Sequence, residues 1–500
     1  MDFPGNLTQP AAQLFIRISN LLKEQHIPAY VVGGFLRDVL LKRETADMDI
    51  AAVGDALEIA QRVAAVLGGR YVLLDKVNGV ARIVLANEKA PSARSQWQLD
   101  FSTLKGNIEQ DLAQRDFTID ALAVDLNQWA EKKASVPLID PLHGWRDLRQ
   151  GVIRTTSEVA FKSDAARLLR AVRLAAELGF SIERETEAQL QRYAHLISGV
   201  AGERIREELL KLLAVPQAES LLPYLDKVGL LTATIPELAQ SKGVAQPKEH
   251  FWDVFEHIIQ TVIAVDFLLR QGKCPYAGEK VLAAAPWSAT LAQHFESEVS
   301  SGSNRRILLK LAALLHDSAK PQAKAIDARG RVRFLGHAQE GATIAANILE
   351  RLRFSSKEIK LVELMVRYHL RPTQMSNEGL PSNKAIYRYF RDTGDAGIDI
   401  LFLSLADHLA TRGPKLTLTY WQEHTKVVEY VLAQRFQQES LVVPPKLVDG
   451  HDLINIFGLS PGPRIGELLE AVREAQASGE LKTREEALAY IREHLLSKTS

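Results

Sequence analysis

The sequence predicts an α+β protein of several domains, with a small sheet domain followed by a longer, mainly helical part. With 500 residues, the chain exceeds the length that one hydrophobic core usually organises. Short apolar stretches alternate with helical patterns at the start of the chain, which is typical of a sheet with interleaved helices. Helical patterns dominate the rest. We therefore place the domains at 1–155, 156–245, 246–440 and 441–500.

The composition is that of an ordinary globular protein. Lys plus Arg and Asp plus Glu each total 61, so a nucleic-acid partner would need a local basic face. The single cysteine, Cys274, excludes an internal disulfide and suits a reducing cytosol. We find no signal peptide and no apolar run of membrane-spanning length. A cytoplasmic protein without membrane contact is expected.

The stretch 30–50 combines a glycine turn with two acidic residues on a strand. Gly33 and Gly34 precede a helix, and Asp47 and Asp49 follow on the next strand. Carboxylates two positions apart on a strand share one face and repel each other, so a divalent cation is their natural ligand. A glycine turn before a helix favours phosphate. Together these features indicate nucleotidyl transfer; the alternative is a tight turn followed by an acidic strand end.

The other elements of the first domain follow from the spacing of apolar residues. We expect helices over 10–25 and 56–67, strands over 71–74, 80–85 and 97–101, and a hairpin loop over 87–95. The last strand carries Asp100. A neighbouring strand would bring this residue to Asp47 and Asp49 as a third carboxylate. A solvent-facing position at a strand end is equally compatible with the sequence.

Arg115 and Asp116 begin a segment whose apolar continuation can anchor in the core. Anchoring would hold the charged pair at the domain edge, where Arg can reach a triphosphate and Asp a sugar hydroxyl. The alternative, a surface pair of adjacent charges, would not need so apolar a continuation. Asp140 and Gly144, further along, indicate a structural turn.

These motifs resemble those of the class II tRNA nucleotidyltransferase and bacterial poly(A) polymerase family. The matching residues, within 30–215, are Gly33-Gly34-x-x-Arg37-Asp38, Asp47-x-Asp49, Arg115-Asp116-Phe117-Thr118 and Asp140-Pro-x-x-Gly144. The resemblance implies a polymerase-β-like nucleotidyltransferase head over 1–155, in which Asp47 and Asp49 hold Mg²⁺, with Asp100 as the candidate third catalytic carboxylate. The residues that would bind the nucleotide in this head are Gly33, Gly34, Arg37, Arg115 and Asp116.

The chain departs from the family pattern at a few positions. Asp120 stands where the family usually has Asn, and Ser163 where it usually has Glu. In members that add a whole CCA end, a long flexible loop usually separates the strand of Asp100 from the Arg-Asp motif. Here only 101–110 precede Asp111 in that connection.

The segment 163–180 is strongly helical, with Ser163 and Asp164 as the expected N-cap. Its charged residues step by three and wind as a ridge around an otherwise apolar helix; they are Asp164, Arg167, Arg170 and Arg173. Arginines on such a helix favour phosphates. An Asp acceptor beside an Arg donor selects cytosine and adenine and rejects uracil and guanine.

The resemblance assigns this base reading to Asp164 and Arg167, and phosphate or sugar contacts to Arg170 and Arg173. It places them in an RNA-binding neck and body over 156–245. The alternative is a set of surface salt bridges.

The third domain carries separated metal-ligand residues on expected helices, namely His257, His316-Asp317, His337, His369 and Asp407. Imidazoles and carboxylates bind Mn, Fe, Ni, Zn or Mg, and helices can bring them to one pocket. Their order resembles the HD phosphohydrolase superfamily, which implies an HD domain over 246–440 with one or two metal ions. Chance scatter is the alternative, and such a domain can persist as an inactive scaffold. The segment 271–299 is expected to be an irregular insertion.

The favoured function is that of a Mg²⁺-dependent tRNA 3′-end nucleotidyltransferase that adds C and/or A from CTP and ATP without a template. The short segment after Asp100 favours addition of the two cytidines. Full CCA addition is the second alternative, and A addition or poly(A) synthesis is the third. From a different class, the chain could be an HD phosphohydrolase whose N-terminal half binds RNA, or a non-catalytic RNA-binding scaffold. The helical tail, 441–500, resembles the C-terminal region of HD-bearing family members.

Overall fold

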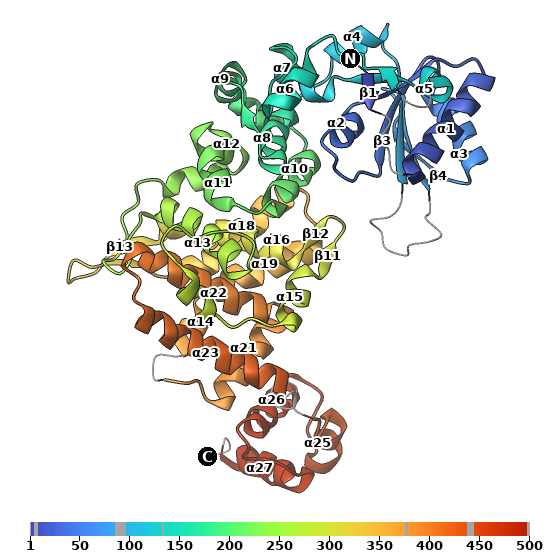
Figure 1. The fold of residues 1–500 in the computed structure, drawn as a ribbon. Coiled ribbons are helices and arrows are strands. Elements are labelled where there is room, and N and C mark those ends of the chain that lie inside the picture. The colour runs from blue at the N-terminus through green and yellow to red at the C-terminus, as the bar shows by residue number, and fades with distance from the viewer. Residues whose placement is uncertain are drawn as a thin grey trace. The chain divides into compact units, whose positions relative to one another are not determined.

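The computed structural model describes residues 2–4, 9–85, 97–132, 135–375, 379–437 and 445–497. They form two compact units, Met1–Val200 with Val228–Leu230, and Ala201–Lys227 with Leu231–Ser500. The sheet lies in the first unit and helices dominate the second (Figure 1), which confirms the α+β class. The loop predicted over 87–95 lies outside the described residues. No helix among the described residues is long and apolar enough to cross a membrane.

A six-stranded mixed sheet forms the centre of the first unit, in the order β4-β5-β6-β3-β2-β7. Its strands are β2 (Ala29–Val32), β3 (Asp47–Ala52), β4 (Arg70–Asp75), β5 (Val80–Leu85), β6 (Trp97–Thr103) and β7 (Ala123–Asp125). Only the β3–β6 pair is parallel; the other neighbours run antiparallel. This parallel register sets Asp49 directly beside Asp100.

Strand alternation decides which face of β3 is buried. Met48 and Ile50 enter the main core of the unit, where they meet residues of α1 (Gln9–Glu24) and α3 (Ala56–Leu67). The residues between them, including Asp49, therefore point to the opposite face. A shift of one residue in this register would bury the carboxylates and expose the core residues, so the apolar pattern fixes the position of the acidic pair.

The other elements of the first unit are short. They are β1 (Asp2–Pro4), α2 (Gly34–Leu40), α4 (Ile108–Ala113), a 3-10 turn (Thr118–Asp120), α5 (Leu126–Lys132), β8 (Ser135–Pro137), α6 (Gly144–Gln150), β9 (Val152–Ile153), α7 (Val159–Ser163), α8 (Ala166–Leu178), β10 (Ser181–Ile182) and α9 (Arg184–Tyr193).

The helix predicted from residue 163 onward is interrupted at its start. Asp164 is extended, with φ −152°, and separates α7 from α8. Its Oδ1 accepts a hydrogen bond from the amide of Ala166 at 3.2 Å. The predicted capping role of Asp164 is partly right: its side chain bonds an amide in the first turn of α8 and its backbone is non-helical, as in a capping residue, but the N-cap position itself is taken by Ala165.

The second unit is built mainly from helices. Its elements from α10 onward are α10 (Gly202–Ala214), α11 (Ala218–Lys227), α12 (Leu230–Thr234), α13 (Val254–Leu268), α14 (Glu279–Ala284), α15 (Ala289–Glu296), β11 (Glu298–Ser300), β12 (Ser303–Asn304), α16 (Arg305–Leu315), α17 (Lys320–Ala323), β13 (Lys324–Ile326), β14 (Val332–Phe334), α18 (His337–Arg351), α19 (Ser356–Tyr368), α20 (Arg371–Met375), α21 (Asn383–Thr393), α22 (Gly397–Arg412), α23 (Leu418–Gln437), α25 (Gly450–Phe457), α26 (Pro463–Ala477) and α27 (Arg484–Ser497).

The irregular insertion expected over 271–299 is only partly irregular, since it contains α14 and α15. Ser288 caps α15 through its hydroxyl, which accepts the amide of Leu291. Leu291 and Phe295 on α15 are buried. Gly278 precedes α14 and Pro286 follows it, whereas α15 is bounded by Ser288 and Ser297. Glycine and proline therefore mark the ends of one of the two helices.

The turn predicted at Asp140 fixes the segment that carries Arg115 and Asp116. The carboxylate of Asp140 accepts the amides of Gly144 at 2.6 Å and Trp145 at 3.1 Å. Gly144 itself lies against the 3-10 turn, where an added Cβ would be 1.9 Å from the carbonyl oxygen of Thr118. Only glycine allows this approach.

We expect Gly144→Ala to destabilise the first unit by at least about 2 kcal/mol, because overpacking against backbone cannot be relieved by a rotamer change. Urea unfolding of the purified protein would measure the loss. Gly199→Ala is the control, since an added Cβ there meets no atom within 4 Å. Equal midpoints for the two variants would contradict the packing described for Gly144.

Candidate active site and metal centre

Three carboxylates gather on one face of the sheet in the first unit. Asp47 and Asp49 lie on β3, and Asp100 lies next to Asp49 on β6. Arg82 on β5 holds Asp100 with two hydrogen bonds of 2.7 Å, from Nε and Nη2. The position anticipated for Asp100 is the one observed, whereas Arg82 was not foreseen. A hard divalent cation prefers carboxylate oxygens. Because both oxygens of Asp100 are bonded to Arg82, Asp47 and Asp49 are the residues that would hold it.

Asp49 lies in a crowded position between the glycine turn and the guanidinium of Arg115. An added Cβ on Gly33 would be 2.8 Å from Oδ2 of Asp49 and 2.9 Å from Nη1 of Arg115. Gly33 also has φ +78°, which favours glycine. Burial raises the pKa of Asp49 to about 6; Arg115 opposes this shift and Asp100 adds to it. A bound divalent cation would stabilise the ionised carboxylate.

Arg37 lies beneath the glycine turn with all three guanidinium nitrogens engaged. Nε and Nη2 donate to Asp38 at 3.0 Å each, and Nη1 donates to Asp120 at 2.7 Å. The guanidinium lies close to Gly34, where an added Cβ would be 3.3 Å from Nη2. The side chain is 11% exposed. Arg37 is therefore held by two carboxylates at the predicted phosphate site.

The ridge on α8 meets the Arg115–Asp116 segment. Nε of Arg170 lies 2.8 Å from Oδ2 of Asp116. Arg167 lies 3.7 Å from Asp164 and donates to the carbonyl of Gln114 at 3.3 Å. The structure thus brings most of the predicted nucleotide-binding residues together.

Arg173 and Arg115 also pair with carboxylates of their own helices or turns. Arg173 is buried and lies 2.8 Å from Glu177, one turn further along α8. Arg115 lies 3.4 Å from Asp111, at the end of α4. The contact of Arg173 with Glu177 lies within α8; its phosphate or sugar contact stays a prediction.

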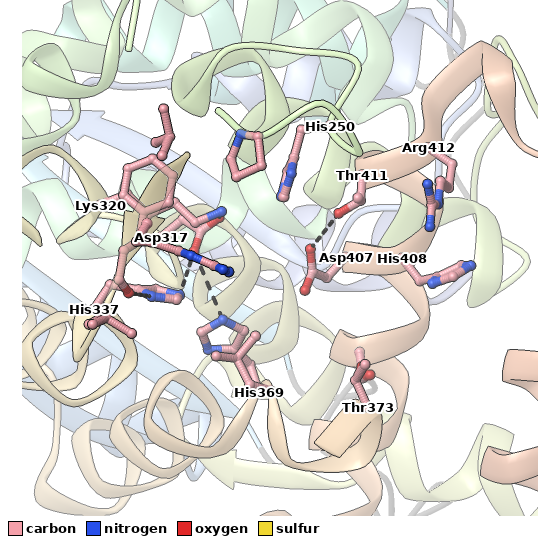
Figure 2. A pocket seen from close by; sticks show the side chains of 17 residues that line it. His250, Asp317, Lys320, His337, His369, Thr373, Asp407, His408, Thr411 and Arg412 are labelled. Atoms are coloured by element: carbon pink, nitrogen blue, oxygen red, sulfur yellow. Dashed lines mark hydrogen bonds and ion pairs between the residues drawn. The ribbon is translucent and has the colours of Figure 1, made fainter. Parts of the chain in front are cut away.

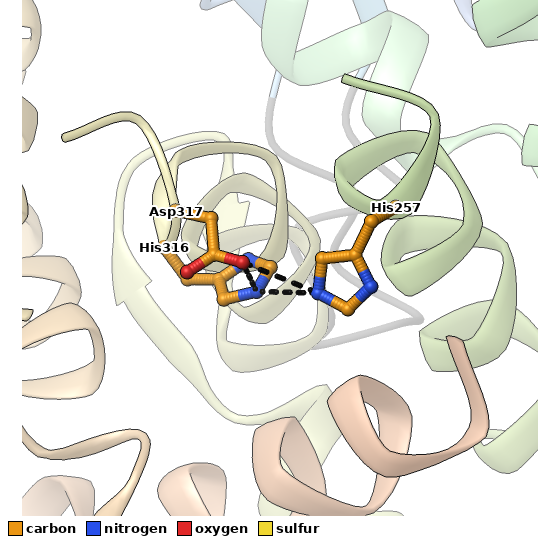
Figure 3. Close-up of side chains that lie close together, drawn as sticks. All are labelled: His257, His316 and Asp317. Carbon is orange, nitrogen blue, oxygen red and sulfur yellow. Dashed lines mark hydrogen bonds and ion pairs between the residues drawn. The ribbon is translucent and has the colours of Figure 1, made fainter. Parts of the chain in front are cut away.

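The six metal-ligand residues predicted in the second half converge in the second unit. They come from α13 (His257), the end of α16 (His316 and Asp317), the start of α18 (His337), the end of α19 (His369) and α22 (Asp407). Figure 3 shows His257, His316 and Asp317 pointing toward one another. Chance scatter is thereby excluded as an account of their positions.

Asp317 is at the centre of this cluster. Its Oδ2 lies 3.2 Å from Nε2 of both His257 and His316. Its Oδ1 lies 3.3 Å from Nε2 of His337 and 3.9 Å from Nε2 of His369. Asp407 completes the first pair, 3.1 Å from His257. One carboxylate thus faces two histidine pairs, as a ligand shared by two metal ions would.

Backbone carbonyls orient three of these histidines. Nδ1 of His316, His337 and His369 lies 2.8, 2.6 and 2.7 Å from the carbonyls of residues 313, 334 and 366. An Nδ1–H donated to each carbonyl leaves Nε2 as the lone-pair donor toward the cluster, which is the arrangement of metal-bound histidines. Burial lowers the pKa of His369 to about 4, so this imidazole is neutral and able to bind a metal.

A cavity of about 460 Å³ opens beside the cluster (Figure 2). Three residues on its wall were missed by the sequence analysis: His250, Lys320 and Arg412. Nζ of Lys320 lies 2.6 Å from Asp317. Burial would raise the pKa of Asp317, but His316 and Lys320 hold it well below its usual range. The spacing of Lys320, one helical turn after Asp317, was the signal available in the sequence.

Comparison with known proteins identifies the family. The chain is 32% identical to an A-adding tRNA nucleotidyltransferase of Deinococcus radiodurans, over 93% of this chain and 94% of that protein. The chain belongs to the tRNA nucleotidyltransferase family. A CC-adding member from Thermus thermophilus is 33% identical over 93% of each chain. Family membership implies dependence on a divalent metal ion.

Family models match the tRNA nucleotidyltransferase chain in four places. They describe a poly(A) polymerase head domain (29–154), a probable RNA- and SrmB-binding site of polymerase A (179–242), an HD domain (279–412) and tRNA nucleotidyltransferase domain 2 (408–491). His257 precedes the HD match.

Solved structures share the fold of this tRNA nucleotidyltransferase. A CCA-adding enzyme in complex with CTP has a TM-score of 0.64 at 22% identity, covering 98% of this chain and 96% of that one. The Thermotoga maritima CCA-adding enzyme in complex with tRNA has a TM-score of 0.59 at 23% identity, with the same coverage.

We expect Asp49→Asn to stabilise the metal-free first unit at pH 7 and above. A folded-state pKa of about 6, against an ordinary value of 3.8, means that wild-type stability falls as the pH rises through 6, when the carboxyl must ionise. The neutral amide avoids this cost, roughly 3 kcal/mol. Urea unfolding between pH 4 and 8 would show a gain that vanishes near pH 4. A variant less stable than wild type at pH 8 would contradict this account.

We expect divalent Mn or Ni to raise the unfolding temperature of the second unit, and Asp317→Ala to abolish that rise. An ion present at 100 times its Kd stabilises by about 2.7 kcal/mol, and Asp317 faces every histidine of the cluster. The comparison uses the metal-induced shift in unfolding temperature of each variant, so a change in the stability of the metal-free protein does not affect it. His451→Ala, at an exposed tail residue, is the control. Equal shifts in wild type and Asp317→Ala would rule out a metal site centred on Asp317.

Proposed function

We propose that this tRNA nucleotidyltransferase adds the two cytidines of the tRNA 3′ end from CTP and does not add the terminal adenosine. The observation that supports this is the connection after Asp100: β6 ends at Thr103 and α4 begins at Ile108. Asn107 and Gln110 form a capping box there, so the connection is short and structured. Family members that add the whole end usually have a long flexible loop at this point.

In the proposed reaction, Asp47 and Asp49 hold Mg²⁺ and Asp100 lies beside them. The metal, when bound, activates the RNA 3′-hydroxyl and stabilises the departing pyrophosphate. In this proposal the backbone amide of Gly34 donates to phosphate, whereas that of Gly33 donates to the carbonyl of Leu122 at 3.2 Å and shapes the turn. The guanidinium of Arg115 lies against Gly33.

Base selection is assigned to Asp164 and Arg167. A carboxylate acceptor beside a guanidinium donor matches the edges of cytosine and adenine and leaves a charge unpaired against uracil or guanine, at a cost of about 1–3 kcal/mol per contact. CTP, ATP and the tRNA 3′ end are the proposed ligands, supported by relatives solved with CTP, ATP and tRNA. Arg170 and Arg173 complete the proposed nucleotide-binding set, and Asp116 takes the sugar hydroxyl.

We also propose a second, metal-dependent phosphohydrolase activity in the HD domain. The observation that favours it is the convergence of all six predicted ligands beside a cavity. Two ions, from Mn, Fe, Ni or Zn, would share Asp317. The division of the chain into a head (1–155), neck and body (156–245), HD domain (246–440) and tail (441–500) belongs to the same proposal.

The deciding experiment supplies tRNA ending at its discriminator base with CTP alone, ATP alone, or both. We expect growth by two cytidines with CTP and no further extension when ATP is added, since the chain has no room for the long flexible loop. Product length on a denaturing gel is the measurement. A complete CCA end would overturn CC specificity, and extension of the tRNA by ATP alone would indicate a different product.

Two variants separate the proposed activities. Asp47→Ala should abolish nucleotide addition, because half of the proposed metal-binding pair is lost, while Asp317→Ala should leave it intact. If Asp47→Ala retained full activity on RNA ends, the head would not be the site of the reaction.

A further inference from the structure

Asp120 is a buried carboxylate positioned between two arginines from different helices. It is 2% exposed and ends the 3-10 turn Thr118–Asp120. Its Oδ1 accepts a hydrogen bond from Nη1 of Arg37 on α2 at 2.7 Å. Its Oδ2 lies 3.8 Å from Nη2 of Arg170 on α8. A carboxylate this deeply buried is costly unless it is paired, so the two arginines are what make its burial tolerable.

Each arginine also holds a second carboxylate. Arg37 binds Asp38 through two hydrogen bonds of 3.0 Å, and Arg170 lies 2.8 Å from Asp116. The ion pairs therefore run without a break from α2 to α8, in the order Asp38, Arg37, Asp120, Arg170, Asp116. Asp120 is the only member of this chain of ion pairs that contacts both helices.

The two arginines in this series of ion pairs lie at the two halves of the proposed nucleotide site. Arg37 lies against Gly34 in the phosphate-binding turn. Arg170 lies one turn after Arg167 on α8, the helix proposed to read the base. Holding Arg37 and Arg170 together therefore fixes the distance between the groups that receive phosphate and the groups that read the base.

We propose that Asp120 is a positioning residue for base selection, which holds the base-reading helix in register with the phosphate-binding turn by pairing with Arg37 and Arg170 at once. The proposal rests on the reading of the base by Asp164 and Arg167. Asp120 does not touch the nucleotide; it acts through the two arginines. In this proposal Arg37 supports the phosphate-binding turn, because all three of its guanidinium nitrogens bond carboxylates.

The test compares Asp120→Ala and Asp120→Asn with wild type, using kcat and KM for the accepted nucleotide and for UTP. Asp120→Ala should lower the preference for the accepted nucleotide by about tenfold or more, because misplacement of about 1 Å is costly in a positioned site. The nucleotide preference of Asp120→Asn should lie between those of wild type and Asp120→Ala. The amide oxygen can still accept a hydrogen bond from Arg37, but the side chain has no charge to pair with Arg170. A preference equal to that of wild type in both variants would overturn the proposal.

Asp147→Asn is the matched control for lost stability. Asp147 is fully buried, accepts a hydrogen bond from Thr118 of the same turn at 2.8 Å and lies 2.9 Å from Arg154. Its substitution should lower the unfolding midpoint without changing the preference over UTP. If Asp147→Asn lowered the preference as much as Asp120→Ala, the effect would be one of general stability and the proposal would be wrong.

Two further variants show which proposal has failed. If Asp120 acts through Arg170, the effects of Asp120→Asn and Arg170→Gln on base preference are not additive in a double-mutant cycle; additive effects would contradict the link. If Arg167→Ala leaves base preference unchanged, the proposed base reading fails, whatever Asp120 does. If Arg167→Ala changes it and Asp120→Ala does not, only the present inference fails.

Discussion

Mutual repulsion among three carboxylates is the constraint on which the first unit depends. Strand alternation places Asp47 and Asp49 on one face, and the parallel register adds Asp100. Such a cluster is stable only if nearby groups offset its charge. Arg82 holds Asp100, and Arg115 lies beside Asp49, where the absence of a side chain on Gly33 makes room for both. The remaining negative charge suits a metal ion, so the repulsion that makes these carboxylates costly is also what would favour a cation beside them.

Arginines in this unit serve two purposes. Some face the place proposed for the nucleotide, and others tie helices together through buried carboxylates. Arg37 makes contacts of the second kind, because Asp38 and Asp120 bond all three of its guanidinium nitrogens. Its role in nucleotide binding stays a prediction. A residue of a motif can thus carry supporting contacts that only the tertiary structure reveals.

The sequence was informative where chemistry is local and silent where it depends on register. Asp47 and Asp49 share a face by strand geometry alone, and the order of the six metal-ligand residues indicated that they converge on one pocket. The central position of Asp317 was not predicted. Arg82 could not be found, because its contact with Asp100 exists only once β5 pairs with β6. The contacts of Asp120 likewise involve residues far away in the sequence, Arg37 and Arg170. Helix ends were the other weakness: the break at Asp164 follows from backbone conformation that apolar spacing does not encode.

The two oxygens of Asp317 divide the cluster in the second unit into halves that share one residue. His257 and His316 face one oxygen, and His337 and His369 face the other. Each half is only partly independent, since an ion in the first changes the charge on the ligand that the second needs. The two ions would therefore bind with different affinities, and the protein with one ion bound would differ chemically from the protein with two. Loss of one histidine would affect one half, whereas replacement of the aspartate removes a ligand from both halves in a single step.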